Sequence, residues 1–151
     1  MLRQRLSDAL KEAMKARDQR GVSTLRLVLA QLKDRDIAAR PAGASGIGEA
    51  EIEEMLLKMV KQRHESIALY KQGNRPDLVR QEEEEITVIE RFMPKQLDEA
   101  EMTAAIATAI GETGAQSIKD MGKVMAKLKE RFPGRMDFAK AGQLVKQRLG
   151  Q

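Results

Sequence analysis

The chain has 151 residues, of which 42 % are hydrophobic and only 3 % aromatic, with nine methionines, one histidine and no cysteine or tryptophan. The absence of cysteine excludes disulfides, thiol chemistry and Cys-ligated zinc, and the single histidine excludes a His-rich metal site. The net charge of +4 is unevenly distributed, because residues 1–40 carry +5, residues 41–93 carry −4 and residues 94–151 carry +3. This pattern suits a polyanionic partner, and a mildly basic protein without such a partner is an equal alternative.

The apolar residues are of the kind that packs helices together. Few aromatic residues and many methionines favour a helical core over a β-sandwich. No apolar run approaches the length of a membrane span, and the first residues, MLRQRLSDALKEAM, contain no long apolar stretch. We therefore expect a soluble, cytoplasmic protein with no membrane partner.

Four amphipathic helices are predicted in the first part of the chain, because apolar residues recur there at spacings of three and four. They cover residues 2–17, a stretch capped by Ser23 or Thr24, a stretch from Glu49 to about Gly73, and residues 76–92. Gly21 is expected to separate the first two. Residues 39–50 contain four glycines or prolines, which predicts a mobile loop.

Three shorter helices are predicted in the rest of the chain. The segment MPKQL, residues 93–97, contains a proline and serves as the predicted boundary between units 1–93 and 97–151. Capping signals at Asp98, Ser117 and Asp137 begin helices that run to about residues 113, 132 and 149. No segment alternates with a period of two. The predicted fold is therefore all-α, with an N-terminal four-helix unit followed by a small three-helix C-terminal unit.

The sixth predicted helix carries two opposed faces. Its apolar arc consists of Ile118, Met121, Met125, Leu128 and Phe132. Its basic face consists of Lys119, Lys123, Lys127 and Arg131 at successive i, i+4 steps, with Arg135 in the corner that follows. Basic side chains in such a row can neutralise successive phosphates of a nucleic acid. The scarcity of aromatic residues favours contact with the backbone of a folded RNA, and a solvated lysine-rich face is the simpler alternative.

No catalytic constellation is apparent, and we expect no metal and no cofactor. The glycines of residues 43–48 follow no strand and precede no Lys-Ser/Thr pair, as a phosphate-binding loop requires. His64 lies alone in a polar run and is interpreted as a surface or rim residue. The four glutamates of residues 82–85 point in different directions around a helix, which favours a solvated face over a metal site.

Three stretches of the sequence resemble the GatB/YqeY family, specifically its free-standing YqeY-like members. They are TLRLVLAQLKDRDI (24–37), KQRHESIALYKQGNRPDLVRQEEEEITVIERFMPKQL (61–97) and MGKVMAKLKERFPGRMDFAKAGQLVKQRL (121–149). The last stretch is also similar to the tail of the GatB component of the tRNA-dependent amidotransferase. The matching residues are Gly122, Val124, Met125, Gly134, Arg135, Val145 and Leu149.

The resemblance implies a four-helix unit followed by a three-helix tail that helps to hold tRNA. Nothing in the chain corresponds to the domain of the amidotransferase that binds ATP, magnesium and the acyl end of the tRNA. The leading hypothesis is therefore a tRNA-binding or accessory module without its own active site. Its candidate partners are tRNA and an amidotransferase or aminoacyl-tRNA synthetase. The alternatives are a component of a carbon–nitrogen ligase with glutamine as amido-N-donor, active only in complex, and a protein–protein adaptor.

Overall fold

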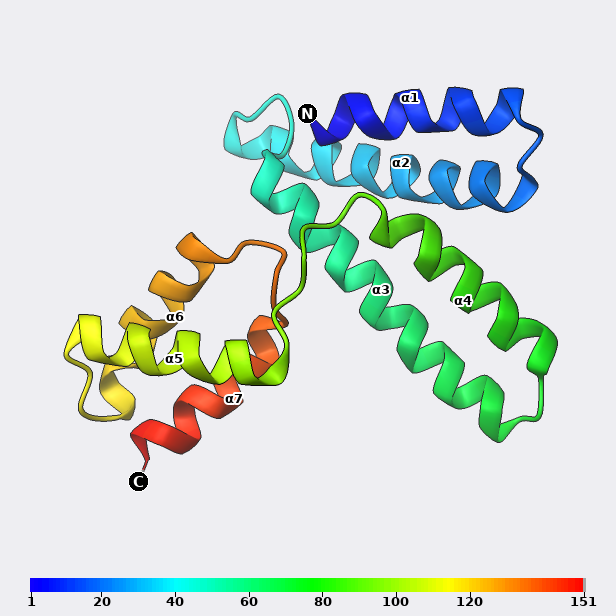
Figure 1. Ribbon diagram of the computed structural model, residues 1–151. Coiled ribbons are helices and arrows are strands. Elements are labelled where there is room, and N and C mark those ends of the chain that lie inside the picture. Colours follow the sequence, from blue (N-terminus) through cyan, green and yellow to red (C-terminus); the bar gives the residue numbers. More distant parts are fainter. Residues whose placement is uncertain (151) are drawn as a thin grey trace. The chain divides into compact units, whose positions relative to one another are not determined.

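The computed structural model describes residues 1–150, and its regular secondary structure is entirely helical over that range (Figure 1). The all-α prediction is confirmed. The elements are α1 (Leu2–Lys15), α2 (Gln19–Ala39), the 3₁₀ turn η1 (Arg40–Ala42), α3 (Glu49–Gln72), α4 (Pro76–Glu90), α5 (Glu99–Thr113), the 3₁₀ turn η2 (Ile118–Asp120), α6 (Met121–Arg131) and α7 (Phe138–Leu149). The chain divides into two compact units, Met1–Pro94 and a second that begins at Lys95.

The first unit contains two antiparallel helix pairs, α1 with α2 and α3 with α4 (Figure 1). Both pairs contribute to one hydrophobic core. Its fully buried side chains include Leu6, Val28, Met55, Leu56 and Ile89. Each buried leucine- or isoleucine-sized side chain contributes about 1.5–3 kcal/mol to folding, so this core is the main source of the unit's stability.

The junction between α1 and α2 differs from the prediction. The second helix begins at Gln19, and Gly21 lies inside its first turn, so the expected cap at Ser23 or Thr24 is wrong. Asp18 is the N-cap, and its Oδ1 accepts a hydrogen bond of 3.0 Å from the backbone N–H of Gly21. A β-carbon at Gly21 would lie 2.3 Å from Asp18 Oδ2. Glycine therefore leaves room for the capping carboxylate and does not end the helix.

The predicted mobile loop of residues 39–50 is fastened at Ile47, which is buried. The Arg3 guanidinium donates to both carboxylate oxygens of Asp36 at 2.6 Å and to the Ile47 carbonyl at 2.8 Å. Asp36 Oδ1 also accepts from the Ile47 N–H at 2.9 Å. These hydrogen bonds, that from Arg3 first, lower the pKa of Asp36 from its usual 3.8 to about 2. The loop is thereby joined to both α1 and α2.

The second unit packs α5, α6 and α7 around a separate core. Its fully buried members include Ile106, Val124, Leu128, Met136 and Val145. The capping box predicted for α5 is present, because Asp98 Oδ1 accepts from the Glu101 N–H at 2.7 Å and Glu101 Oε1 accepts from the Asp98 N–H at 3.2 Å. The residues before α5 are tied to the α6–α7 corner, where the Leu97 N–H donates to the Arg135 carbonyl at 2.9 Å.

The apolar arc predicted for the sixth helix is only partly buried. Leu128 is completely buried, Met121, Met125 and Phe132 are partly buried, and Ile118 is 47 % exposed. Val124, which lies outside the predicted arc, is completely buried. Residues 118–120 form a 3₁₀ turn and α6 starts at Met121. Ile118 therefore precedes the regular helix. It lines an open hollow with Gln143 and Lys146 of α7, where its side chain stays half exposed.

Candidate nucleic-acid interface

Lys119 and Lys123 are the two exposed lysines of the predicted basic face. Lys119 lies in η2 and Lys123 in the first turn of α6, and both side chains are exposed. Neither forms an ion pair with any of residues 1–150. Their charges are therefore available to an external anion without the breaking of an ion pair, although the charge of Lys123 also helps to lower the pKa of Asp120.

Asp120 lies between these two lysines and is occupied by the backbone. Its carboxylate accepts hydrogen bonds from the N–H groups of Gln116 at 3.0 Å and Ser117 at 3.4 Å. These bonds, that from Gln116 first, hold the pKa of Asp120 below its usual value. The residue forms the predicted capping box with Ser117. Its negative charge organises the start of the helical segment and reduces the local positive potential.

The next two members of the basic face are paired within the unit. Glu112, near the end of α5, forms two ion pairs through its Oε2, one with Lys127 Nζ at 3.9 Å and a shorter one with Arg131 Nη2. All three side chains are partly exposed, so these ion pairs contribute at most about 1 kcal/mol each. An incoming phosphate would compete with Glu112 for both cations.

Arg135 is held at the corner between α6 and α7. Its Nε donates to the Lys95 carbonyl at 2.9 Å, and its guanidinium lies 5.6 Å from the centre of the Phe132 ring. The preceding Gly134 has φ +71°, in the left-handed region that favours glycine, and it sets the direction of the corner. The five predicted residues thus lie on one helical segment and its corner. They comprise two unpaired lysines, two paired cations and one arginine bound to the backbone.

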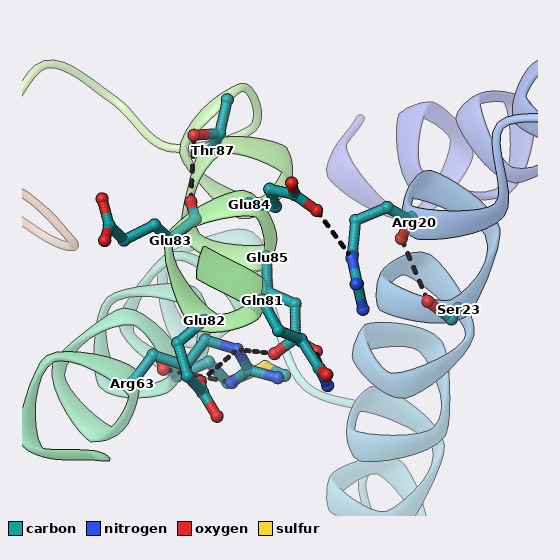
Figure 2. Close-up of polar contacts among 10 residues, drawn as sticks. Arg20, Ser23, Arg63, Gln81, Glu82, Glu83, Glu84, Glu85 and Thr87 are labelled. Carbon is teal, nitrogen blue, oxygen red and sulfur yellow. Dashed lines mark hydrogen bonds and ion pairs between the residues drawn. The ribbon is translucent and has the colours of Figure 1, made fainter. Parts of the chain in front are cut away.

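The acidic run of α4 is not a fully solvated face. Glu85 is 6 % exposed, and its Oε2 accepts from Arg63 Nε at 2.9 Å (Figure 2). Gln81 Nε2 donates to the other oxygen of Glu85 at 3.3 Å, and Glu82 lies 3.9 Å from Arg63 Nε. Burial, the larger cause, and the neighbouring Glu85 raise the pKa of Glu82. The solvated-face interpretation is therefore wrong for Glu85, which with Arg63 joins α4 to α3.

The other acids of this run point in different directions, as their positions around the helix require. Glu84 accepts from Arg20 Nε of α2 at 3.0 Å, and Glu83 is exposed (Figure 2). Within residues 1–150 no three His, Asp or Glu side chains are grouped so as to hold a metal ion. His64 is exposed, as predicted. The same range contains no helix of the length and apolarity needed to cross a membrane.

Comparison with known proteins identifies the family. The model of the YqeY-like protein family matches residues 3–149, so the chain belongs to this family. A protein of Lachancea thermotolerans named Altered inheritance of mitochondria protein 41, mitochondrial, is 31 % identical over 109 residues, which cover 71 % of this chain and 57 % of that protein. Its namesake from Saccharomyces cerevisiae is 28 % identical over 128 residues, covering 79 % of this chain and 68 % of that protein.

The names and lengths of the two relatives bear on the predicted location and on how much of each relative this chain matches. Both relatives are named as mitochondrial proteins, which contradicts the predicted cytoplasmic location. The matched region spans little more than half the length of the Lachancea thermotolerans protein.

Proposed function

We propose that this YqeY-like chain is a tRNA-binding or accessory module without its own active site, and that the start of α6 contacts the phosphate backbone. The observation that carries the proposal is that Lys119 and Lys123 are exposed and unpaired among residues 1–150. An unpaired ammonium group can approach a phosphate and release a counterion without breaking an internal ion pair. These two lysines should therefore contribute most to binding.

The contribution of each remaining cation of the basic face to tRNA binding should depend on the internal contacts that hold its side chain. Lys127 and Arg131 must leave Glu112 or share it with a phosphate, which reduces their net contribution. Arg135 is already oriented by Phe132 and the Lys95 carbonyl, so it loses little side-chain entropy on binding. The expected order of importance is the unpaired lysines first and the paired cations last.

The form of RNA follows from the aromatic residues of the second unit. Phe132 and Phe138 are partly buried against its core, and no tyrosine or tryptophan occurs after residue 94. The unit therefore has little aromatic surface for stacking on unpaired bases. Contact with the backbone of a folded RNA suits this surface better. The resemblance of residues 121–149 to the tail of the amidotransferase GatB component favours tRNA among folded RNAs.

The test is a tRNA titration at low and moderate salt, because phosphate contacts weaken as the salt concentration rises. Lys119→Glu combined with Lys123→Glu should weaken binding at least about tenfold at low salt and flatten the salt dependence. A matched control reverses the charge of Lys33 and Lys58, two exposed lysines of the first unit. An equal loss of tRNA affinity in both double variants would show that binding depends on net charge and not on the position of these lysines. Absence of binding by the unmodified protein at low salt would refute the proposal.

A further inference from the structure

A second basic feature lies at the turn between α3 and α4, in the first unit. The turn encloses an open hollow of about 450 Å³. Its lining includes Tyr70, Lys71, Arg75, Val79, Arg80 and Glu83. The volume lies within the range of roughly 300–1,000 Å³ that small-molecule sites occupy. Tyr70 is the chain's one tyrosine, so the hollow combines this aromatic ring with cationic side chains.

The backbone fixes the positions of the aromatic and basic side chains. The Arg75 N–H donates to the Tyr70 carbonyl at 2.9 Å, and the Asn74 N–H donates to the Lys71 carbonyl at 3.2 Å. Asn74 has φ +54°, which completes the left-handed ending of α3 known as a Schellman motif. Tyr70 and Lys71 therefore lie in a defined last turn of α3. The following helix α4 supplies the remaining wall of the hollow.

Of the three cations that line the hollow, Arg75 alone has an ion-pair partner among residues 1–150. Lys71 and Arg80 are exposed and form no ion pair with any of residues 1–150. Arg75 is paired with Asp77, through Nε to Oδ1 at 3.2 Å and Nη2 to Oδ2 at 3.0 Å. The hollow is therefore locally cationic, although the surrounding sequence segment, residues 41–93, carries a net charge of −4.

The acids responsible for the negative charge of α4 mostly face other partners. Glu82 and Glu85 face Arg63, and Glu84 faces Arg20. Glu83 is the acid that remains at the hollow, and Figure 2 shows its side chain pointing away from Arg63. A plain phosphate would be repelled by this carboxylate. A ribose hydroxyl or a base amino group could instead donate a hydrogen bond to it.

We propose that this hollow binds a nucleoside phosphate, presented free or as an unstacked nucleotide of an RNA. The base stacks on Tyr70 and contacts Val79, the phosphate pairs with Lys71 and Arg80, and Glu83 accepts a hydrogen bond from the ribose or the base. Stacking of one base on an aromatic side chain changes affinity by roughly 5- to 150-fold. The site belongs to the first unit and does not depend on the basic face of α6.

The single tyrosine provides a selective probe. Replacement of tyrosine by 3-fluorotyrosine labels residue 70 alone, so the full-length protein gives one fluorotyrosine ¹⁹F NMR signal. Titration with AMP and with a short single-stranded RNA should shift this signal saturably. Comparison of the two titrations shows whether the free nucleotide or the RNA is the better ligand. Inorganic phosphate should bind at least tenfold more weakly than AMP, because it lacks the base and the ribose.

Variants separate the site from general charge effects. Lys71→Gln with Arg80→Gln should weaken AMP binding at least tenfold, whereas Lys58→Gln with Lys33→Gln should leave it unchanged. Tyr70→Leu, measured by equilibrium dialysis, should weaken AMP binding at least fivefold and leave phosphate binding unchanged. Circular dichroism verifies that each variant retains its helices.

Three results would overturn the proposal. The first is no ¹⁹F shift at millimolar AMP or RNA in low salt. The second is equal affinity for inorganic phosphate and AMP, which would indicate an anion site only. The third is a stronger response to polyglutamate than to either nucleotide ligand, which would indicate an acidic protein partner. The Lys119 and Lys123 variants should leave the AMP response unchanged, so failure of the α6 proposal does not affect this one.

Discussion

Replacement of Arg63 by methionine should destabilise the first unit by about 3 kcal/mol. The substitution retains much of the apolar stem but leaves the buried Glu85 carboxylate without its cation. Removal of one member of a buried ion pair typically costs about 3–5 kcal/mol, because the remaining charge has lost its solvation and its partner. The lower value applies here, because the Arg63 and Glu82 side chains retain 13 % and 16 % exposure and Gln81 still donates to Glu85.

Urea unfolding followed by circular dichroism at pH 7 measures this loss. For a unit of this size, a loss of about 3 kcal/mol corresponds to a fall in Tm of roughly 12–24 °C. The double variant Arg63→Met with Glu85→Leu removes both charges and should recover to within about 1 kcal/mol of the unmodified protein. The matched control is Arg20→Met, which breaks the exposed pair with Glu84 and should cost less than about 1 kcal/mol. Equal effects of the two single variants, or no recovery in the double variant, would refute the argument.

Three further predictions concern other contacts. Folding lowers the pKa of Asp36 to about 2, so the stabilisation from its ionised carboxylate is present above the unfolded value near 3.8 and is lost as the pH falls toward 2. In urea unfolding, Asp36→Asn should cost about 1–2 kcal/mol at pH 7 and progressively less below pH 4. Arg17 has φ +55°, so Arg17→Gly should raise stability by about 0.5–1 kcal/mol in thermal unfolding, whereas an equal gain from Arg17→Ala would contradict a backbone origin. Glu112→Gln releases Lys127 and Arg131 and should tighten tRNA binding severalfold at low salt, with a smaller gain at high salt. An unchanged affinity would show that these two cations do not contact the tRNA.

Local signals in the sequence account for the helix starts that were predicted correctly. Asp98 with Glu101 and Asp137 cap helices in the way their spacing indicates, because a cap depends on the three or four residues next to it. The start of α2 was missed because the choice of Asp18 depends on Arg17 adopting a left-handed conformation that residue type does not favour. Ile118 was misplaced because α6 starts only at Met121, and Ile118 lies before it in a 3₁₀ turn where its side chain is 47 % exposed.

The side-chain environments were harder to predict, because they depend on residues distant in the chain. Glu83 and Glu85 have the same side chain and are two positions apart, yet one is exposed and the other is buried against Arg63 of another helix. The spacing of the basic face predicts that its cations share a side of the helix. This spacing contains no information on Glu112, which lies on α5 and forms ion pairs with Lys127 and Arg131. The family resemblance is confirmed, whereas RNA binding remains a proposal.

The hydrogen bonds of residues 95–97 define where the second unit must be cut for separate expression. The Lys95 carbonyl accepts from Arg135 Nε at 2.9 Å, Gln96 Nε2 donates to the Gly134 carbonyl at 2.6 Å, and the Leu97 N–H donates to the Arg135 carbonyl at 2.9 Å. A fragment that starts at the first helical residue, Glu99, would lose all three. A fragment that starts at or before Lys95 keeps the segment that braces the α6–α7 corner, and with it the orientation of the Arg135 guanidinium.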